Sequence, residues 1–93
     1  MLVLVETFYA DSEKSSSPIR VRPVAEQGLS PQMRVECSKR MRYSFPVGQK
    51  FLLEAKIVHH ESGSSFLYSN YRDKWYPVAE SEAQEFLREA GNR

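Results

Sequence analysis

The residues best suited to chemistry in this sequence are a basic run, SKRMRYS, that begins at Ser38. Lys39, Arg40 and Arg42 carry three positive charges within one short turn, and Ser38 is a suitable residue to cap that turn. Tyr43 adds a ring beside them. Cations that neutralise phosphate and rings that stack on bases are the two components of sequence-tolerant nucleic-acid binding. This run is therefore the best candidate in the chain for contact with an anion.

A group of aromatic residues is the second candidate binding surface. Tyr68, Tyr71, Trp75 and Tyr76 fall within nine residues, and a domain this small is not expected to bury all of them. A partly exposed set of rings is suited to a peptide groove or to a base-stacking platform. The alternative is that the rings pack beneath a helix or in a contact between two copies of the chain.

Cys37, His59 and His60 are the residues to consider as a nucleophile or as metal ligands. Cys37 follows Met33 and Val35 in an alternating apolar register, which predicts a packed thiol with a raised pKa rather than a nucleophile. His59 and His60 are neighbours on a predicted strand, so they point to opposite faces and are not expected to chelate one metal ion. We therefore predict no catalytic residue, no metal site and no cofactor. An enzyme of unknown class ranks third, after a protein-binding or assembly module and a nucleic-acid-binding module.

Composition and charge narrow the class of protein. The chain has 93 residues, 41% hydrophobic and 27% charged, which predicts a single small globular domain over residues 1–93. One cysteine excludes an intramolecular disulfide, and the apolar start is too short for a signal peptide or a membrane span, so we expect a cytoplasmic protein without membrane contact. Residues 19–56 hold eight Lys and Arg against three Glu, whereas 1–18 and 57–93 are both acidic. This asymmetry predicts self-complementary assembly or an anionic partner at the middle of the chain, unless the charges are simply solvated.

Short strands are the elements expected to position these residues. Period-two alternation and β-branched or aromatic composition predict them. The predicted strands are Leu2–Tyr9, Ile19–Val24, Met33–Cys37, Lys50–His60, Phe66–Tyr71 and Trp75–Val78. The polar, serine-rich stretch 10–18 is predicted to be a long mobile loop. Because residues 2–5 are continuously apolar, we expect both faces of the first strand to be covered.

The long strand Lys50–His60 predicts most of the core. Alternation assigns one face to the core, and that face carries Phe51, Leu53, Ala55, Ile57 and His59. Leu52 and Val58 interrupt the opposite, polar face, so we expect that face to be covered in part, by a helix or by a second copy of the chain.

A C-terminal amphipathic helix is predicted over residues 81–90. Ser81 and Gln84 match a capping box, and Gly91 supplies the stop. The apolar residues fall at helical spacing, so one stripe is expected to dock on the sheet. That stripe is Ala83, Phe86, Leu87 and Ala90.

Together these elements predict a mainly β fold: a small antiparallel, partly open barrel of five or six strands with one C-terminal helix. The runs VRPV at 21–24, RVECS at 34–38, FPVG at 45–48 and FLYS at 66–69 resemble short uncharacterised bacterial proteins, some of them carried on mobile integron gene cassettes. The resemblance covers about residues 19–78. It implies an SH3-like barrel and assigns no active site.

Two function classes follow. The first is a non-enzymatic binding or assembly module, which contacts a protein partner or a second copy through a sheet face and the aromatic group. The second is a nucleic-acid-binding barrel that uses the basic segment 34–50, with Tyr43 or Tyr71 stacking on bases. The cations of that segment are Arg34, Lys39, Arg40, Arg42 and Lys50.

Overall fold

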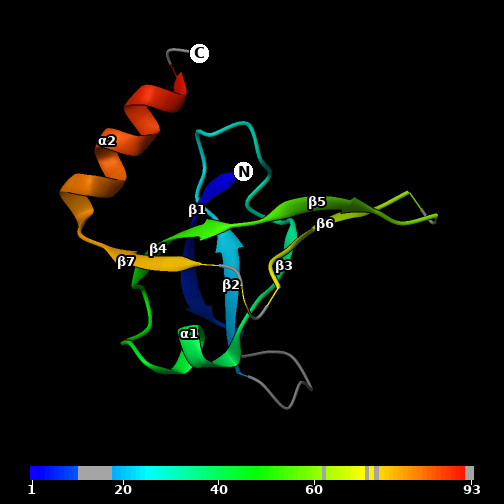
Figure 1. The fold of residues 1–93 in the computed structure, drawn as a ribbon, viewed down its shortest axis with the longest axis horizontal. Coiled ribbons are helices and arrows are strands. Elements are labelled where there is room, and N and C mark those ends of the chain that lie inside the picture. The colour runs from blue at the N-terminus through cyan, green and yellow to red at the C-terminus, as the bar shows by residue number, and fades with distance from the viewer. Residues whose placement is uncertain (11–17, 62, 71, 73, 92–93) are drawn as a thin grey trace.

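Two β-sheets and two helices make up the fold of the described residues (Figure 1). The computed structural model describes residues 1–10, 18–61, 63–70, 72 and 74–91. The elements are β1 (Leu2–Tyr9), β2 (Ile19–Pro23), β3 (Arg34–Glu36), α1 (Lys39–Tyr43), β4 (Lys50–Glu54), β5 (Lys56–His59), β6 (Ser65–Tyr68), β7 (Trp75–Val78) and α2 (Glu80–Gly91). Most of the predicted loop 10–18, and Tyr71 at the end of a predicted strand, lie outside the described residues.

The strands form a four-stranded sheet and a three-stranded sheet. Sheet A has the order β2-β1-β4-β7 and is antiparallel throughout. Sheet B has the order β3-β6-β5, with β5 antiparallel and β3 parallel to β6. The prediction of a mainly β fold with antiparallel sheets and a C-terminal helix is confirmed. The finer prediction of a partly open antiparallel barrel of five or six strands is not confirmed, because the described strands form two sheets that are not closed into a barrel and β3 runs parallel to β6. The strands at the adjoining edges of the two sheets are poorly suited to pair with each other, because Pro23 at the end of β2 has no N–H to donate and β3 is only three residues long.

The predicted strand Lys50–His60 is two strands that belong to different sheets. The break is at Ala55, whose N–H donates to the carbonyl of Met1 (2.9 Å) and whose carbonyl accepts from the N-terminal ammonium (2.9 Å). Beyond it, the β5–β6 hairpin projects from the body (Figure 1). Ile57 is consequently 38% exposed and His59 is exposed, so their assignment to the core is wrong.

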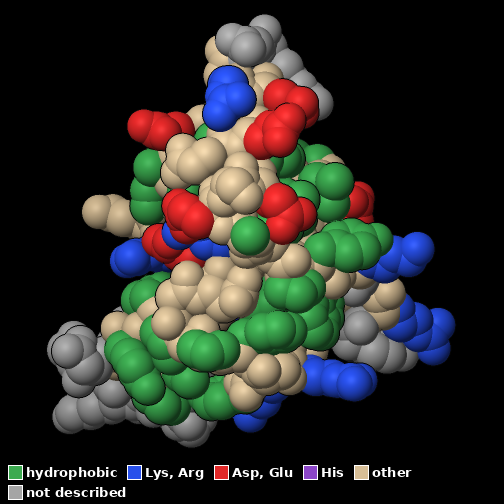
Figure 2. Space-filling view, turned by 90° about the vertical axis from the view of Figure 1, so that its left-hand side faces the viewer, with side chains coloured by type: hydrophobic (Ala, Val, Ile, Leu, Met, Phe, Trp, Pro, Cys, Tyr) green, Lys and Arg blue, Asp and Glu red, His purple; other side chains and the backbone are tan. Residues whose placement is uncertain are grey.

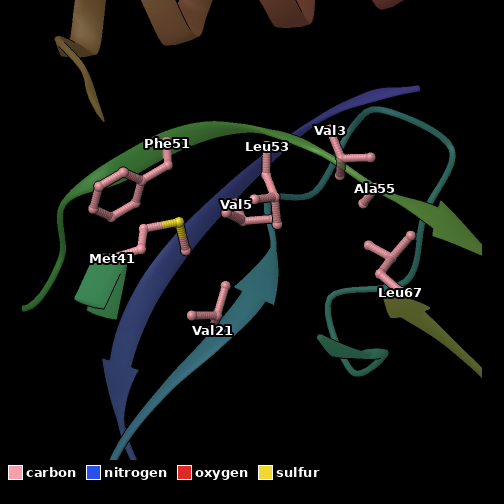
Figure 3. Close-up of a cluster of buried hydrophobic side chains, with 8 residues drawn as sticks. All are labelled: Val3, Val5, Val21, Met41, Phe51, Leu53, Ala55 and Leu67. Atoms are coloured by element: carbon pink, nitrogen blue, oxygen red, sulfur yellow. The ribbon is translucent and has the colours of Figure 1, made fainter. Parts of the chain in front are cut away.

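The main core lies on the inner face of sheet A, where α1 and sheet B close over it (Figure 3). Phe51 from β4, Met41 from α1 and Leu67 from β6 are all fully buried. The cluster consists of Val3, Val5, Val21, Met41, Phe51, Leu53, Ala55 and Leu67. Three elements that are distant in sequence therefore share one apolar centre, and this burial is the main force that holds the sheets together.

Helix α2 covers the other face of sheet A. Leu4 from β1 and Ala83 from α2 are fully buried there, together with Val78 and Leu87. Leu52 packs against this cluster, as expected for an apolar residue on the supposed polar face. The prediction that both faces of β1 are covered is thus confirmed for Val3, Leu4 and Val5, whereas Leu2 is 48% exposed.

The start of α2 differs from its prediction. Strand β7 ends at Val78 and the helix begins at Glu80. The N–H of Ala79 donates to Glu82 Oε1 (2.9 Å). Glu82, not Gln84, therefore occupies the third helical position and makes the capping contact. Neither α1 nor α2, the helices of the described residues, is long and apolar enough to cross a membrane.

Candidate anion-binding groove

A groove of about 630 Å³ lies where β2, β3 and α1 meet. Four arginines contribute to its lining, namely Arg20, Arg22, Arg34 and Arg42. Its apolar lining comes from side chains such as Val21 and Val35. Since β2 and β3 are edge strands of the two sheets, the groove lies at the seam between sheet A and sheet B. We call it the arginine groove.

Three elements bring these arginines together. On β2, alternation turns Val21 into the core, where it is 5% exposed, and turns Arg20 and Arg22 to the opposite face. On α1, the fully buried Met41 anchors the short helix. The N–H of Arg40 donates to Ser38 Oγ (3.1 Å), so the predicted N-cap is present.

Arg42 is the arginine that the short helix α1 contributes to the groove. Its Nη1 donates to the carbonyl of Ile19 (3.3 Å), which joins α1 to β2. Its Nε is buried and has no hydrogen-bond partner among the described residues. A buried donor left unsatisfied costs about 1–3 kcal/mol. The unsatisfied Nε indicates that the hydrogen-bonding capacity of the Arg42 guanidinium is not fully used within the described protein.

Arg22 and Arg34 are each held by one carboxylate and one ring. Arg22 Nε lies 2.9 Å from a carboxylate oxygen of Glu6, and its guanidinium carbon lies 4.7 Å from the centre of the Phe8 ring. Arg34 Nη2 lies 3.2 Å from Glu36 Oε1, and its guanidinium carbon lies 4.9 Å from the Phe66 ring centre. These contacts orient the flat guanidinium groups but neutralise only part of the positive charge.

The remaining predicted basic residues divide between two places. Lys39, Arg40 and Tyr43 are exposed on α1, close to the groove in sequence but outside its lining. Lys50 lies on the outer face of sheet A, where its Nζ is 2.9 Å from Glu80 and 3.7 Å from Glu6. The hydrogen bond with Glu80 raises the pKa of Lys50 and lowers the pKa of Glu80. Lys50 is thus engaged by two carboxylates and does not line the arginine groove.

The described members of the aromatic group do not form one surface. Trp75 packs edge-to-face against Phe51 in the core, with ring centres 5.9 Å apart. Tyr68 is half-buried on β6, and Lys56 Nζ lies 5.8 Å from its ring centre. Tyr76 is 47% exposed on β7. Trp75 and Tyr76 therefore belong to sheet A, and Tyr68 is the described ring of this group that lies on sheet B.

Cys37 contributes to the groove lining and packs against the main core. Burial raises the pKa of its thiol to about 11, and the positive charge of Arg42 opposes that rise. The thiol is therefore protonated at neutral pH and is unsuited to act as a nucleophile. Among the described residues, no group of three or more His, Cys, Asp or Glu side chains is placed to bind a metal ion.

Sequence reasoning did not include Arg20 and Arg22 in the site. Their alternation with Val21 indicated only a strand with one solvated face. The stronger signal is Pro23 directly after them. A proline indicates an edge strand, and cations on an edge strand lie beside any groove that forms between that edge and the other sheet.

Comparison of the chain with protein-family models, with curated proteins and with solved structures finds no match.

Proposed function

We propose that this protein is a non-enzymatic binding module whose arginine groove binds the phosphate backbone of a nucleic acid. The observation that supports this function best is Arg42, a cation with a buried, unsatisfied Nε at a groove that three other arginines line. Guanidinium groups match phosphate oxygens in geometry and form strong charge-assisted hydrogen bonds with them.

The number of arginines sets the expected salt dependence. Three or four phosphate contacts predict a slope of about −2 to −4 when the logarithm of the binding constant is plotted against the logarithm of salt concentration. Glu36 lies in the groove lining and lowers the local positive charge. The groove is therefore expected to bind with moderate affinity, and that affinity should fall as the salt concentration rises.

The decisive variant is Arg42→Gln, which removes the charge but keeps a polar side chain. We expect it to weaken binding of a labelled oligonucleotide by about 10-fold, the loss typical of one hydrogen bond to a charged group. Fluorescence anisotropy at several salt concentrations measures both the affinity and the slope, and circular dichroism verifies the fold.

Arg88→Gln is the matched control, because Arg88 is an exposed arginine on α2. It should leave both affinity and slope unchanged. Equal losses in the two variants would show that only net charge matters. Absence of any salt-sensitive binding at low ionic strength would end the proposal.

Assembly of copies is the second candidate function, and the charge of α2 favours it. Acidic side chains surround this helix (Figure 2), among them the exposed Glu82, Glu85 and Glu89. Their charge is opposite to that of the arginine groove, so one copy is electrostatically complementary to another. Light scattering across a concentration series tests this function: a mass that rises with concentration and falls with salt supports it, whereas a monomer at all concentrations contradicts it.

A further inference from the structure

The outer face of sheet B carries a row of planar and cationic side chains. Leu67, at the centre of β6, is fully buried, so its neighbours Phe66 and Tyr68 point to the opposite face. The sheet register places Arg34 opposite Phe66 and Lys56 opposite Tyr68. Each ring therefore has a cation against it, at 4.9 Å for Phe66 and 5.8 Å for Tyr68.

A hollow of about 350 Å³ lies beside Phe66. Arg34 and His60 line it together with Phe66, and the His60 and Phe66 ring centres are 5.0 Å apart with the planes tilted by 35°. Gln32 also lines the hollow, and its side-chain amide makes no hydrogen bond with any residue that the structure describes. The hollow thus combines flat groups for stacking with a free amide that can donate and accept.

We propose that this face binds unpaired nucleobases, so that the ligand of the protein is single-stranded nucleic acid. One base occupies the hollow at Phe66 and a neighbouring base stacks on Tyr68. The inference rests on the proposed function, because the arginine groove supplies the phosphate contacts. Arg34 lines both the groove and the hollow, so a strand bound in the groove reaches Phe66 without a gap.

The spacing of the two rings favours a single strand over a duplex. Residues two apart on a β-strand are separated by about 6.7 Å, whereas successive nucleotides of one duplex strand rise by about 3.4 Å. Bases that meet both rings must therefore be unstacked from each other, as they are in an extended single strand. Glu36 shares this face, but its carboxylate is engaged with Arg34 at 3.2 Å.

The test compares two oligonucleotides of equal length, one with bases and one abasic throughout, by fluorescence anisotropy with wild type and with Phe66→Leu/Tyr68→Leu. Two stacking contacts predict that wild type binds the base-bearing strand about 30-fold or more tightly than the abasic strand. In the double variant this ratio should fall towards one. Affinity for the abasic strand should stay the same in Tyr68→Leu, because the Tyr68 ring lies against Lys56 and not against an arginine of the groove. Tyr76→Leu removes an exposed ring from β7 and is the control that should keep the full ratio.

The outcomes separate this inference from the proposed function. Equal, salt-sensitive binding of both strands to wild type would overturn base stacking and leave the groove proposal intact. Binding of a duplex as tightly as the single strand would do the same. No binding of either strand would overturn both proposals. If the double variant does not fold, Tyr68→Leu alone should lower the ratio by about 5-fold or more, the effect of one stacking contact, and a ratio unchanged from wild type would count against stacking.

Discussion

Sheet A and sheet B are built for different tasks. In β1 of sheet A, three consecutive residues, Val3, Leu4 and Val5, are at most 1% exposed, because the main core covers one face and α2 covers the other. In β6 of sheet B, only Leu67 is fully buried, and Phe66 and Tyr68 on the other face are half-buried. Covering both faces of a sheet provides stability, whereas a face left open is available to a ligand.

The charges show the same contrast. The outer face of sheet A carries a chain of ion pairs across its strands, in which Glu6 contacts Arg22 and Lys50, and Lys50 contacts Glu80. On sheet B, Lys56 lies against the Tyr68 ring instead. Lys50 of sheet A is thus paired with two carboxylates, whereas Lys56 of sheet B lies against a ring. Stability and binding should therefore respond to mutations in different places.

The largest effect on stability is expected from Phe51→Ala in sheet A. Phe51 is fully buried and its ring packs edge-to-face against Phe45 (5.3 Å) and Trp75 (5.9 Å). Its removal leaves a cavity and should lower the free energy of unfolding by about 3–5 kcal/mol, as measured by urea denaturation. Ile57→Ala in sheet B is the matched comparison, and we expect it to cost less than about 1 kcal/mol because Ile57 is already 38% exposed. Equal losses at the two positions would contradict the contrast between the sheets.

Leu4→Ala should have the next largest effect, because it acts on the contact between sheet A and α2. Leu4 is fully buried against Ala83 and Leu87, so the loss is expected to be about 2–4 kcal/mol. Hydrogen exchange locates the effect: amides of α2 should exchange faster in the variant, while amides of β6 keep their wild-type rates. Uniform acceleration in both elements would indicate that α2 is part of one cooperative unit with sheet B.

The smallest effect is expected from Glu80→Gln, which tests the ion-pair chain. The hydrogen bond with Lys50 lowers the pKa of Glu80 and raises the pKa of Lys50. A lowered carboxyl pKa stabilises the fold above its unfolded value of about 4.3 and loses that effect as pH falls through the folded value. Wild type should therefore have a slightly higher urea midpoint than Glu80→Gln at neutral pH, and the difference should vanish in acid.

The raised pKa of Lys50 acts at the other end of the pH scale. The contribution of protonated Lys50 to the stability of the fold is complete below the unfolded pKa of about 10.4 and is lost as pH rises through the folded pKa.

Glu85→Gln, on the same helix as Glu80, is the control for Glu80→Gln, and its urea midpoint should match that of wild type at every pH. A difference between wild type and Glu80→Gln that persists unchanged in acid would mean that the carboxylate is not its source.

Local patterns in the sequence predicted the elements of the fold well. The amphipathic stripe predicted α2, and the continuous apolar start predicted that β1 is covered on two faces. Ser38 was correctly predicted to cap α1, and Cys37 was correctly predicted to be a packed thiol. Each of these features depends on residues that are close in sequence, where spacing alone determines which side chains share a face.

The errors arose where distant segments meet. The alternation of apolar residues continues through Ala55, so the pattern gave no sign that the chain leaves sheet A there and joins sheet B. The parallel pairing of β3 with β6 and the burial of Trp75 also depend on tertiary contacts that the local sequence does not specify. The arginine groove combines β2, β3 and α1, so Arg20 and Arg22 could be assigned to it only from the structure.

Pro23, which ends β2, has a consequence for the behaviour of the protein at high concentration. The other outer strand of sheet A, β7, carries Pro77, and the register places both prolines at positions whose backbone nitrogen points away from the neighbouring strand. Each outer edge therefore lacks one N–H that an incoming strand would need. Sheet A is protected on both sides against edge-to-edge aggregation, and we expect any association of copies to occur through sheet B, the arginine groove or α2.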